Sequence, residues 1–153
     1  MLKDIVQKLN IDTVEERPFQ SVVEFLPSLW MPDEIIVELM SVSRKDGFEI
    51  GPIKFLPFNR LQSLNMTELY LPWLRLGFLT FAAGLSGDPV AFDLGRIRIA
   101  YLCHDRMDET QPPNAGDVVI ANLSFSDFYQ SAHTDNQFPR DWYAAEKRWG
   151  EKP

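Results

Sequence analysis

The sequence predicts an α+β domain in which helices flank an antiparallel β-sheet. Apolar residues follow helical spacing near both ends of the chain, around residues 2–9, 35–42 and 125–129. Between residues 76 and 102, apolar or alternating segments are separated by short turns, a pattern typical of strands joined in a meander. Helices separated along the chain from consecutive antiparallel strands define the α+β class.

Length and composition are those of one globular domain, which we expect to span residues 1–153. Of the 153 residues, 45% are hydrophobic and 24% are charged, so the chain can bury a core without metals or disulfides. Its single cysteine, Cys103, lies in an apolar segment and is predicted to be a core thiol in a reducing compartment. The first residues lack the apolar run of a signal peptide, and no run is long enough to cross a bilayer. We therefore expect a cytoplasmic protein without membrane association.

The first third of the chain predicts two helices and one ambiguous segment. Residues 2–9 predict a short amphipathic helix. Residues 22–29 fit either a buried strand or a helical turn, and Pro27 is expected to interrupt both. A clearer helix is predicted to begin at Met31–Pro32 with acids in its first turn and to end before Gly47.

The centre of the chain predicts three strands. They lie at residues 76–82, 90–92 and 96–102, joined by the turns 83–89 and 93–95. The alternation of apolar and polar residues in the third segment predicts one buried and one solvated face of the sheet.

The last third of the chain predicts a loop at residues 111–116, an apolar segment at 118–121 and a helix capped by Ser124. Asp127 stands at the third position of this helix, where a carboxylate is favourable. From Pro139 onward the pattern fits either a final helix packed on the sheet or a partly ordered tail.

The two histidines do not predict a catalytic or metal site. His104–Asp105 is similar to the dyad of metal-dependent phosphohydrolases, but those enzymes use further histidines that this chain lacks. We expect His104 at the end of a strand and His133 in solvent. Because no cysteine and histidine cluster has metal-ligand spacing, we expect no catalytic residue, no metal and no cofactor. The segment Gly84–Asp88 is predicted to be a strand-connecting turn, since a phosphate loop would lead into a helix.

The charge of the chain is acidic and unevenly distributed. There are 15 basic and 22 acidic side chains, a net charge of −7, and residues 85–135 hold eight acids against three bases, a net −5. Such a surface repels phosphate backbones, so nucleic acid is excluded as a partner. It would attract a basic protein and speed its arrival, although solubility alone also accounts for the charge.

Several short motifs occur in a fixed order along the chain: Met31–Pro32, Asp46–Gly47, Gly87–Asp88, Phe92–Asp93, His104–Asp105 and Ser124–Phe128. This ordered set resembles the SMI1/KNR4, or SUKH, superfamily over residues 31–132. Asp46–Gly47 replaces the usual Asn-Gly, and His104–Asp105 replaces His-Glu. The stretch 47–72 is longer than is usual in the family.

The resemblance implies a curved antiparallel sheet, a core at about 31–132 and a C-terminal helix or tail at 133–153. Family members are regarded as immunity proteins that bind and neutralise bacterial toxin domains, often nucleases or deaminases, while fungal relatives are regulatory interaction proteins. We therefore expect a non-catalytic protein-binding module, a monomer or weak dimer, with a basic toxin domain as partner. The residues predicted to contact it are acids at the meander turns: Asp88, Asp93, Asp105, Asp108 and Glu109.

Two other hypotheses stay open. The first is a scaffold or regulatory domain without a toxin partner. The second is a small enzyme that uses His104 and the acids between Asp88 and Asp105. A dry site holding His104 beside two acids would favour the enzyme, and an isolated, exposed His104 would exclude it. Each acid taken singly is also explained as a solvated turn residue.

Overall fold

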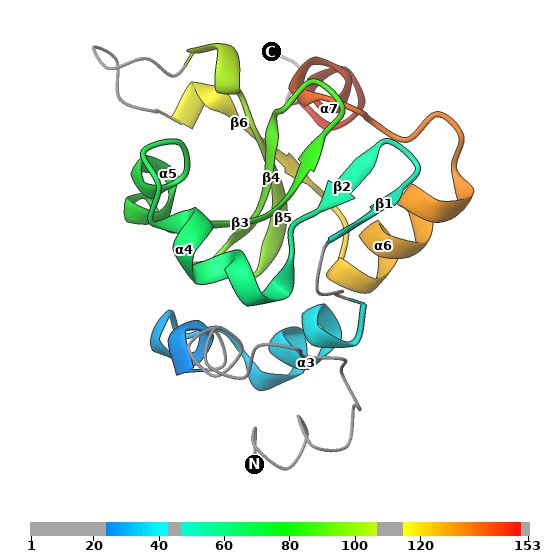
Figure 1. Cartoon of the computed structure of the whole chain (residues 1–153). Coiled ribbons are helices and arrows are strands. Elements are labelled where there is room, and N and C mark those ends of the chain that lie inside the picture. The colour runs from blue at the N-terminus through cyan, green and yellow to red at the C-terminus, as the bar shows by residue number, and fades with distance from the viewer. Residues whose placement is uncertain (1–23, 43–46, 107–114, 151–153) are drawn as a thin grey trace.

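A computed structural model of the chain describes residues 24–42, 47–106 and 115–150 (Figure 1). The helices are α3 (Asp33–Val42), α4 (Leu61–Asn65), α5 (Leu71–Arg75), α6 (Phe125–Thr134) and α7 (Trp142–Trp149). The strands are β1 (Phe48–Ile50), β2 (Ile53–Phe55), β3 (Phe78–Gly84), β4 (Pro89–Asp93), β5 (Arg98–Leu102) and β6 (Val118–Ala121). All six strands form one antiparallel sheet in chain order, which confirms the predicted α+β class.

The predicted meander is the centre of this sheet, and the strands at its edges were not predicted. β1 and β2 form a hairpin that pairs with β3, while β6 pairs with β5. β1 and β2 have three residues each, too few to show an alternating pattern in the sequence. Pairing with β3 and β5, rather than local pattern, therefore establishes these strands.

One face of the sheet carries an aromatic core. The rings of Phe81 and Phe92 lie 4.4 Å apart between centroids, and Phe81 makes edge contacts with Phe125 and Phe128 of α6 at 5.6 and 5.9 Å. α6 begins where predicted, because the Ser124 side chain accepts a hydrogen bond from the Asp127 backbone N–H at 3.1 Å. This cap and the buried phenylalanines fix α6 against the sheet.

The central strands are also buried on the other face, so the prediction of a solvated face for the meander is wrong, whereas Glu49 and Lys54 on the β1–β2 part of that face are exposed. Trp73 of α5 has no exposed surface and packs with Ala91, Ala100 and Leu102. The small alanine side chains make room for the indole. α4 and α5 lie in the connection between β2 and β3, and α4 is tied to the sheet by Asn65.

Asn65 is a side-chain clamp on β3. Its amide group donates to the Thr80 carbonyl at 2.8 Å, and its oxygen accepts from the Thr80 backbone N–H at 2.9 Å. The sequence Asn65–Met–Thr67 has the form of a glycosylation site, but the side chain is fully buried. Asn65 is therefore a structural residue of the folded chain.

Residues 24–28 are helical and include Pro27, so the expected interruption at Pro27 is wrong. Phe25 and Leu26 of this segment join the main core. The predicted helix at 2–9 lies outside the described residues. Among the helices that the structure describes, none is long and apolar enough to cross a membrane.

The C-terminal segment is a helix packed on the sheet, not a tail. Asp141 caps α7 by accepting from the Ala144 backbone N–H at 2.7 Å, and Trp142 is buried in the main core. The Tyr101 hydroxyl donates to the Pro139 carbonyl at 2.9 Å, and burial raises the pKa of this phenol.

Cys103 is buried, which confirms the predicted core thiol.

Candidate functional site

The predicted contact residues do not form one cluster. In an antiparallel meander, the β3–β4 turn and the β5–β6 connection lie at one end of the sheet, and the β4–β5 turn lies at the other. Asp88 and Asp105 therefore share one end, and Asp93 lies at the opposite end. Asp108 and Glu109 lie outside the described residues.

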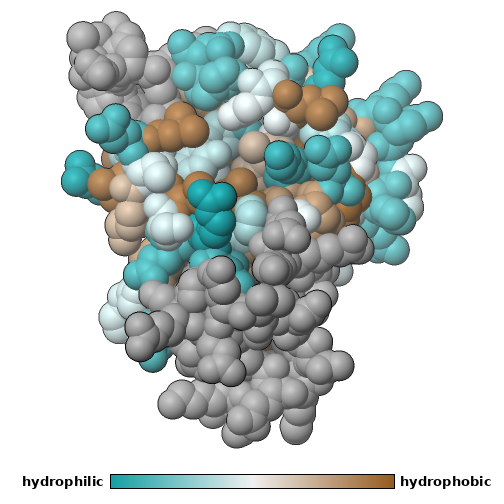
Figure 2. All heavy atoms as spheres, viewed as in Figure 1, coloured by the Kyte–Doolittle hydropathy of each residue, from teal (hydrophilic) through white to brown (hydrophobic). Residues whose placement is uncertain are grey.

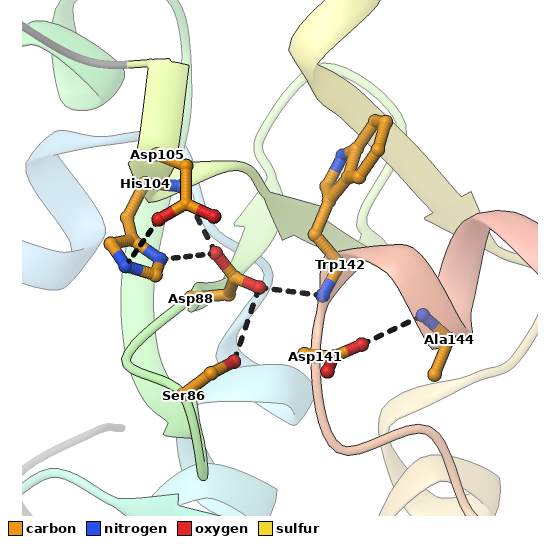
Figure 3. Close-up of polar contacts among 7 residues, drawn as sticks. All are labelled: Ser86, Asp88, His104, Asp105, Asp141, Trp142 and Ala144. Atoms are coloured by element: carbon orange, nitrogen blue, oxygen red, sulfur yellow. Dashed lines mark hydrogen bonds and ion pairs between the residues drawn. The ribbon is translucent and has the colours of Figure 1, made fainter.

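Asp88 is buried, with 1% of its surface exposed. Its Oδ1 accepts from the His104 backbone N–H at 3.0 Å and lies 2.5 Å from the His104 ring Nδ1 (Figure 3). Its Oδ2 accepts from the Trp142 backbone N–H at 2.7 Å and from the Ser86 hydroxyl at 3.5 Å. The prediction that Asp88 contacts a partner is therefore corrected. This carboxylate faces inward and joins the β3–β4 turn, the end of β5 and the start of α7.

Two glycines let the β3–β4 turn reach this position. Gly87 has φ +91°, a left-handed backbone conformation that side chains disfavour, as the predicted turn requires. At Gly84, an added Cβ would lie 2.1 Å from the Arg140 carbonyl oxygen. This close approach allows the Leu85 backbone N–H to donate to the same oxygen at 3.0 Å. The turn is thereby held against the segment that leads into α7.

His104 lies between two carboxylates. Its Nε2 is 2.9 Å from an oxygen of Asp105 (Figure 3). The side chains of His104 and Asp105 are 32% and 53% exposed. Each ring nitrogen of His104 thus contacts a different carboxylate. His104 is therefore neither isolated nor dry.

This arrangement has part of the geometry of a general base. A buried carboxylate on Nδ1 orients an imidazole so that Nε2 can take a proton from a substrate. Here the Asp105 carboxylate occupies Nε2, and the Ser86 hydroxyl lies against Asp88 rather than against the imidazole. His104 therefore has a structural role, because its two ring nitrogens link Asp88 to Asp105.

Asp93 is a half-buried turn residue. Its Oδ1 accepts from the Gly95 backbone N–H at 3.1 Å, and its Oδ2 lies 3.5 Å from the guanidinium of Arg98. Both partners are within five residues of Asp93 along the chain. This carboxylate stabilises the β4–β5 turn that contains it.

Three exposed side chains adjoin residues of the Asp88 network: Leu85 precedes Ser86, Tyr143 follows Trp142, and Asp105 contacts His104. We call these three residues the hairpin surface, after the β3–β4 hairpin that carries Leu85. Leu85 is 68% exposed, Tyr143 is 52% exposed, and Asp105 carries the exposed carboxylate. Sequence patterns missed Leu85 and Tyr143. An apolar residue between the turn glycines was the available signal for Leu85. Tyr143 follows the buried Trp142, so helical geometry places it about 100° away, on the solvent side.

On the described part of the face seen in Figure 1, apolar residues are scattered among polar ones (Figure 2). His133 is exposed, as predicted. In the described ranges, no group of three or more histidine, cysteine or acidic side chains is placed to hold a metal ion. Comparisons of the chain with protein-family models, curated proteins and solved structures find no match.

Proposed function

We propose that this chain is a non-catalytic protein-binding module of the SUKH type, and that it neutralises a bacterial toxin domain by binding it. The single observation that carries the proposal is the fixed position of the hairpin surface. Asp88 bonds to backbone groups 16 and 54 residues away. Leu85, Asp105 and Tyr143 are therefore displayed on segments that are already tied together.

Such preorganisation favours binding, because less side-chain and loop freedom is lost when the partner arrives. Tyrosine is among the residues that most often dominate binding energy, and Leu85 adds apolar area beside α7. The exposed carboxylate of Asp105 favours a basic partner. A surface of this kind would cover a toxin's active site or substrate groove without any chemistry of its own.

The resemblance to the SUKH superfamily supports the same proposal. Two of its motifs, Gly87–Asp88 and His104–Asp105, are separate in the sequence and meet at the Asp88 carboxylate. Direct contact between them gives these motifs a shared structural role. That role is to build the end of the sheet that carries the hairpin surface.

The experiment is co-expression of the chain with the products of the genes adjacent to its own, with growth and pull-down as readouts. The double variant L85S/Y143S is compared with M66S/L69S, in which two apolar residues that are each 48% exposed are changed elsewhere. We expect the first variant to bind about 30-fold more weakly and the second to behave as wild type.

A toxin that is equally lethal with and without the wild-type chain would sink the immunity proposal. Capture of a different, non-toxic protein through the hairpin surface would favour the scaffold hypothesis. Equal losses in the two double variants would mean that the hairpin surface is not the binding site.

Catalysis by His104 is the second candidate, favoured by the two flanking carboxylates. The variants H104A and D105N separate the two functions. A general base would lose neutralisation completely in H104A even when the protein is folded and still captures the toxin. A binding module loses neutralisation only in proportion to its affinity.

A further inference from the structure

Trp30 is the most exposed of the large apolar side chains in the described part of the chain, at 90%. It lies in the turn between the helical residues 24–28 and α3. Its neighbour Met31 is 4% exposed and belongs to the main core. The chain therefore buries Met31 and exposes the residue before it, although an indole offers far more apolar surface than a methionine.

The backbone of Trp30 does not explain the choice of tryptophan. Its φ is +63°, and its N–H donates to the Pro27 carbonyl at 3.0 Å as the preceding helix ends. Glycine, or sometimes asparagine, is the usual residue in the left-handed position that closes a helix. A bulky residue there is a genuine outlier. The turn requires the left-handed conformation, but neither the turn nor the core requires an indole.

The described chain on either side of Trp30 is acidic. The described residues 24–42 contain Glu24, Asp33, Glu34 and Glu38, and no lysine or arginine. In α3 the buried Ile36 and Leu39 face the core, so helical periodicity places Glu34 and Glu38 on the solvent side. We call Glu24, Trp30, Asp33 and Glu34 the Trp30 surface.

We propose that the Trp30 surface binds a basic protein segment, with an arginine or lysine side chain of the partner against the indole face. Tryptophan is the best aromatic acceptor for a cation, and surrounding carboxylates add Coulomb attraction. α3 lies across the sheet from the β3–β4 turn and α7 (Figure 1). This site is therefore separate from the hairpin surface and stands whether or not that surface binds a toxin.

The test uses the full chain and a synthetic peptide of alternating arginine and glycine, with a glutamate–glycine peptide as control. Binding is followed by NMR at the four tryptophan indole N–H signals, and W30F identifies the signal of Trp30. We expect the arginine peptide to shift the Trp30 signal to saturation and to leave the signals of buried Trp73 and Trp142 in place.

Matched variants separate a site from general charge attraction. E24Q/E34Q should weaken the arginine peptide about fivefold, whereas E49Q/E68Q, which removes two exposed acids elsewhere, should change it less than twofold. In isothermal titration calorimetry, W30G should abolish binding of the arginine peptide, and its thermal midpoint should not fall, because glycine suits the left-handed turn.

Three results would overturn the inference. Equal weakening by the two acid-to-amide pairs would mean nonspecific attraction to a chain of net charge −7. Unchanged affinity in W30G would exclude the indole. The Trp30 signal is the one that W30F lacks. If this signal shows an indole protected from solvent in the free chain, another segment or a second copy covers Trp30. L85S/Y143S should leave peptide binding unchanged, so failure here is distinct from failure of toxin neutralisation.

Discussion

Strand β4 is flanked by two aspartates, and the two ends of this strand use them differently. Asp88, just before the strand, is 1% exposed and accepts hydrogen bonds from His104 and Trp142. Asp93, the last residue of the strand, is half-buried and contacts Gly95 and Arg98. The partners of Asp88 stand 16 and 54 residues away, while those of Asp93 stand two and five residues away.

The difference teaches that residue type and turn composition do not decide what a turn carboxylate does. Asp88 follows Gly87 and Asp93 precedes Gly95, each in a turn. Both acids were predicted to contact a protein partner. At one end, two distant segments deliver N–H donors that replace water around the carboxylate. At the other end, the turn supplies its own donor and the carboxylate keeps part of its hydration. The first three predictions below test this contrast, and the fourth extends it to a surface carboxylate on another element.

The largest effect is expected at Asp88. D88N keeps the shape of the side chain but has one acceptor oxygen, so its NH₂ group must face a buried N–H donor of either His104 or Trp142. Leaving a buried donor without an acceptor should lower the free energy of unfolding by about 3 kcal/mol. Urea denaturation followed by circular dichroism measures this loss. A loss below about 1 kcal/mol would show that Asp88 is not the centre of this end.

The second effect is expected at His104. H104A removes the ring bonds to Asp88 and Asp105 but keeps the backbone N–H that Asp88 accepts. We expect the free energy of unfolding to fall by about 1.5 kcal/mol, less than in D88N, because the His104 side chain is partly solvated. A double-mutant cycle with D88N should give a coupling of about 1 kcal/mol, and additive losses would contradict the network.

A smaller effect is expected at Asp93. Asparagine still accepts from the Gly95 N–H and loses only the 3.5 Å contact with Arg98. D93N should therefore cost about 0.5 kcal/mol in the same urea experiment. A loss as large as that of D88N would remove the contrast between the two ends of β4.

The smallest effect is expected at Asp135, a carboxylate on the surface. The Arg148 side chain donates to it at 2.7 Å and, with the Gln137 backbone N–H, lowers the pKa of this carboxyl below its usual value. A lowered pKa in the fold stabilises the fold above the unfolded pKa, and this stabilisation is lost as the pH falls through the folded pKa. D135N should thus be slightly less stable than wild type at pH 7.

The same comparison repeated in acid gives the control. Below the folded pKa of Asp135 both proteins carry an uncharged group at this position, so the small difference should vanish. A difference that persists unchanged in acid would mean that Asp135 acts through hydrogen bonds alone. Added salt should also reduce the difference at pH 7, because exposed ion pairs are screened.

The sequence predicted the parts of the fold that depend on neighbouring residues. The helix after Met31–Pro32, the Ser124 cap and the three central strands are local patterns of spacing, capping and turn residues, and the structure contains each of them. The short strands β1 and β2 and the second core under Trp73 carried no such local signal. Their existence depends on the partners that they pack against.

For the candidate site the division is similar. The sequence brought attention to Asp88, Asp93 and Asp105 through their turns, but treated them as equals. It gave only a weak signal for Leu85 and none for Tyr143 or Trp30, since exposure is a property of the folded surface. An apolar residue in a turn does not by itself indicate a binding surface, because apolar side chains are more often buried in a core.

By itself, then, the sequence determined the class of the fold, the order of its central elements and the net negative charge of the chain. These follow from composition and from contacts within a few residues along the chain. Only the tertiary structure decided that Asp88 faces inward, that both faces of the central strands are covered and that Trp30 is exposed. The reason is physical: burial and hydrogen bonding at these positions depend on segments up to 54 residues away, and no local pattern records which segments meet.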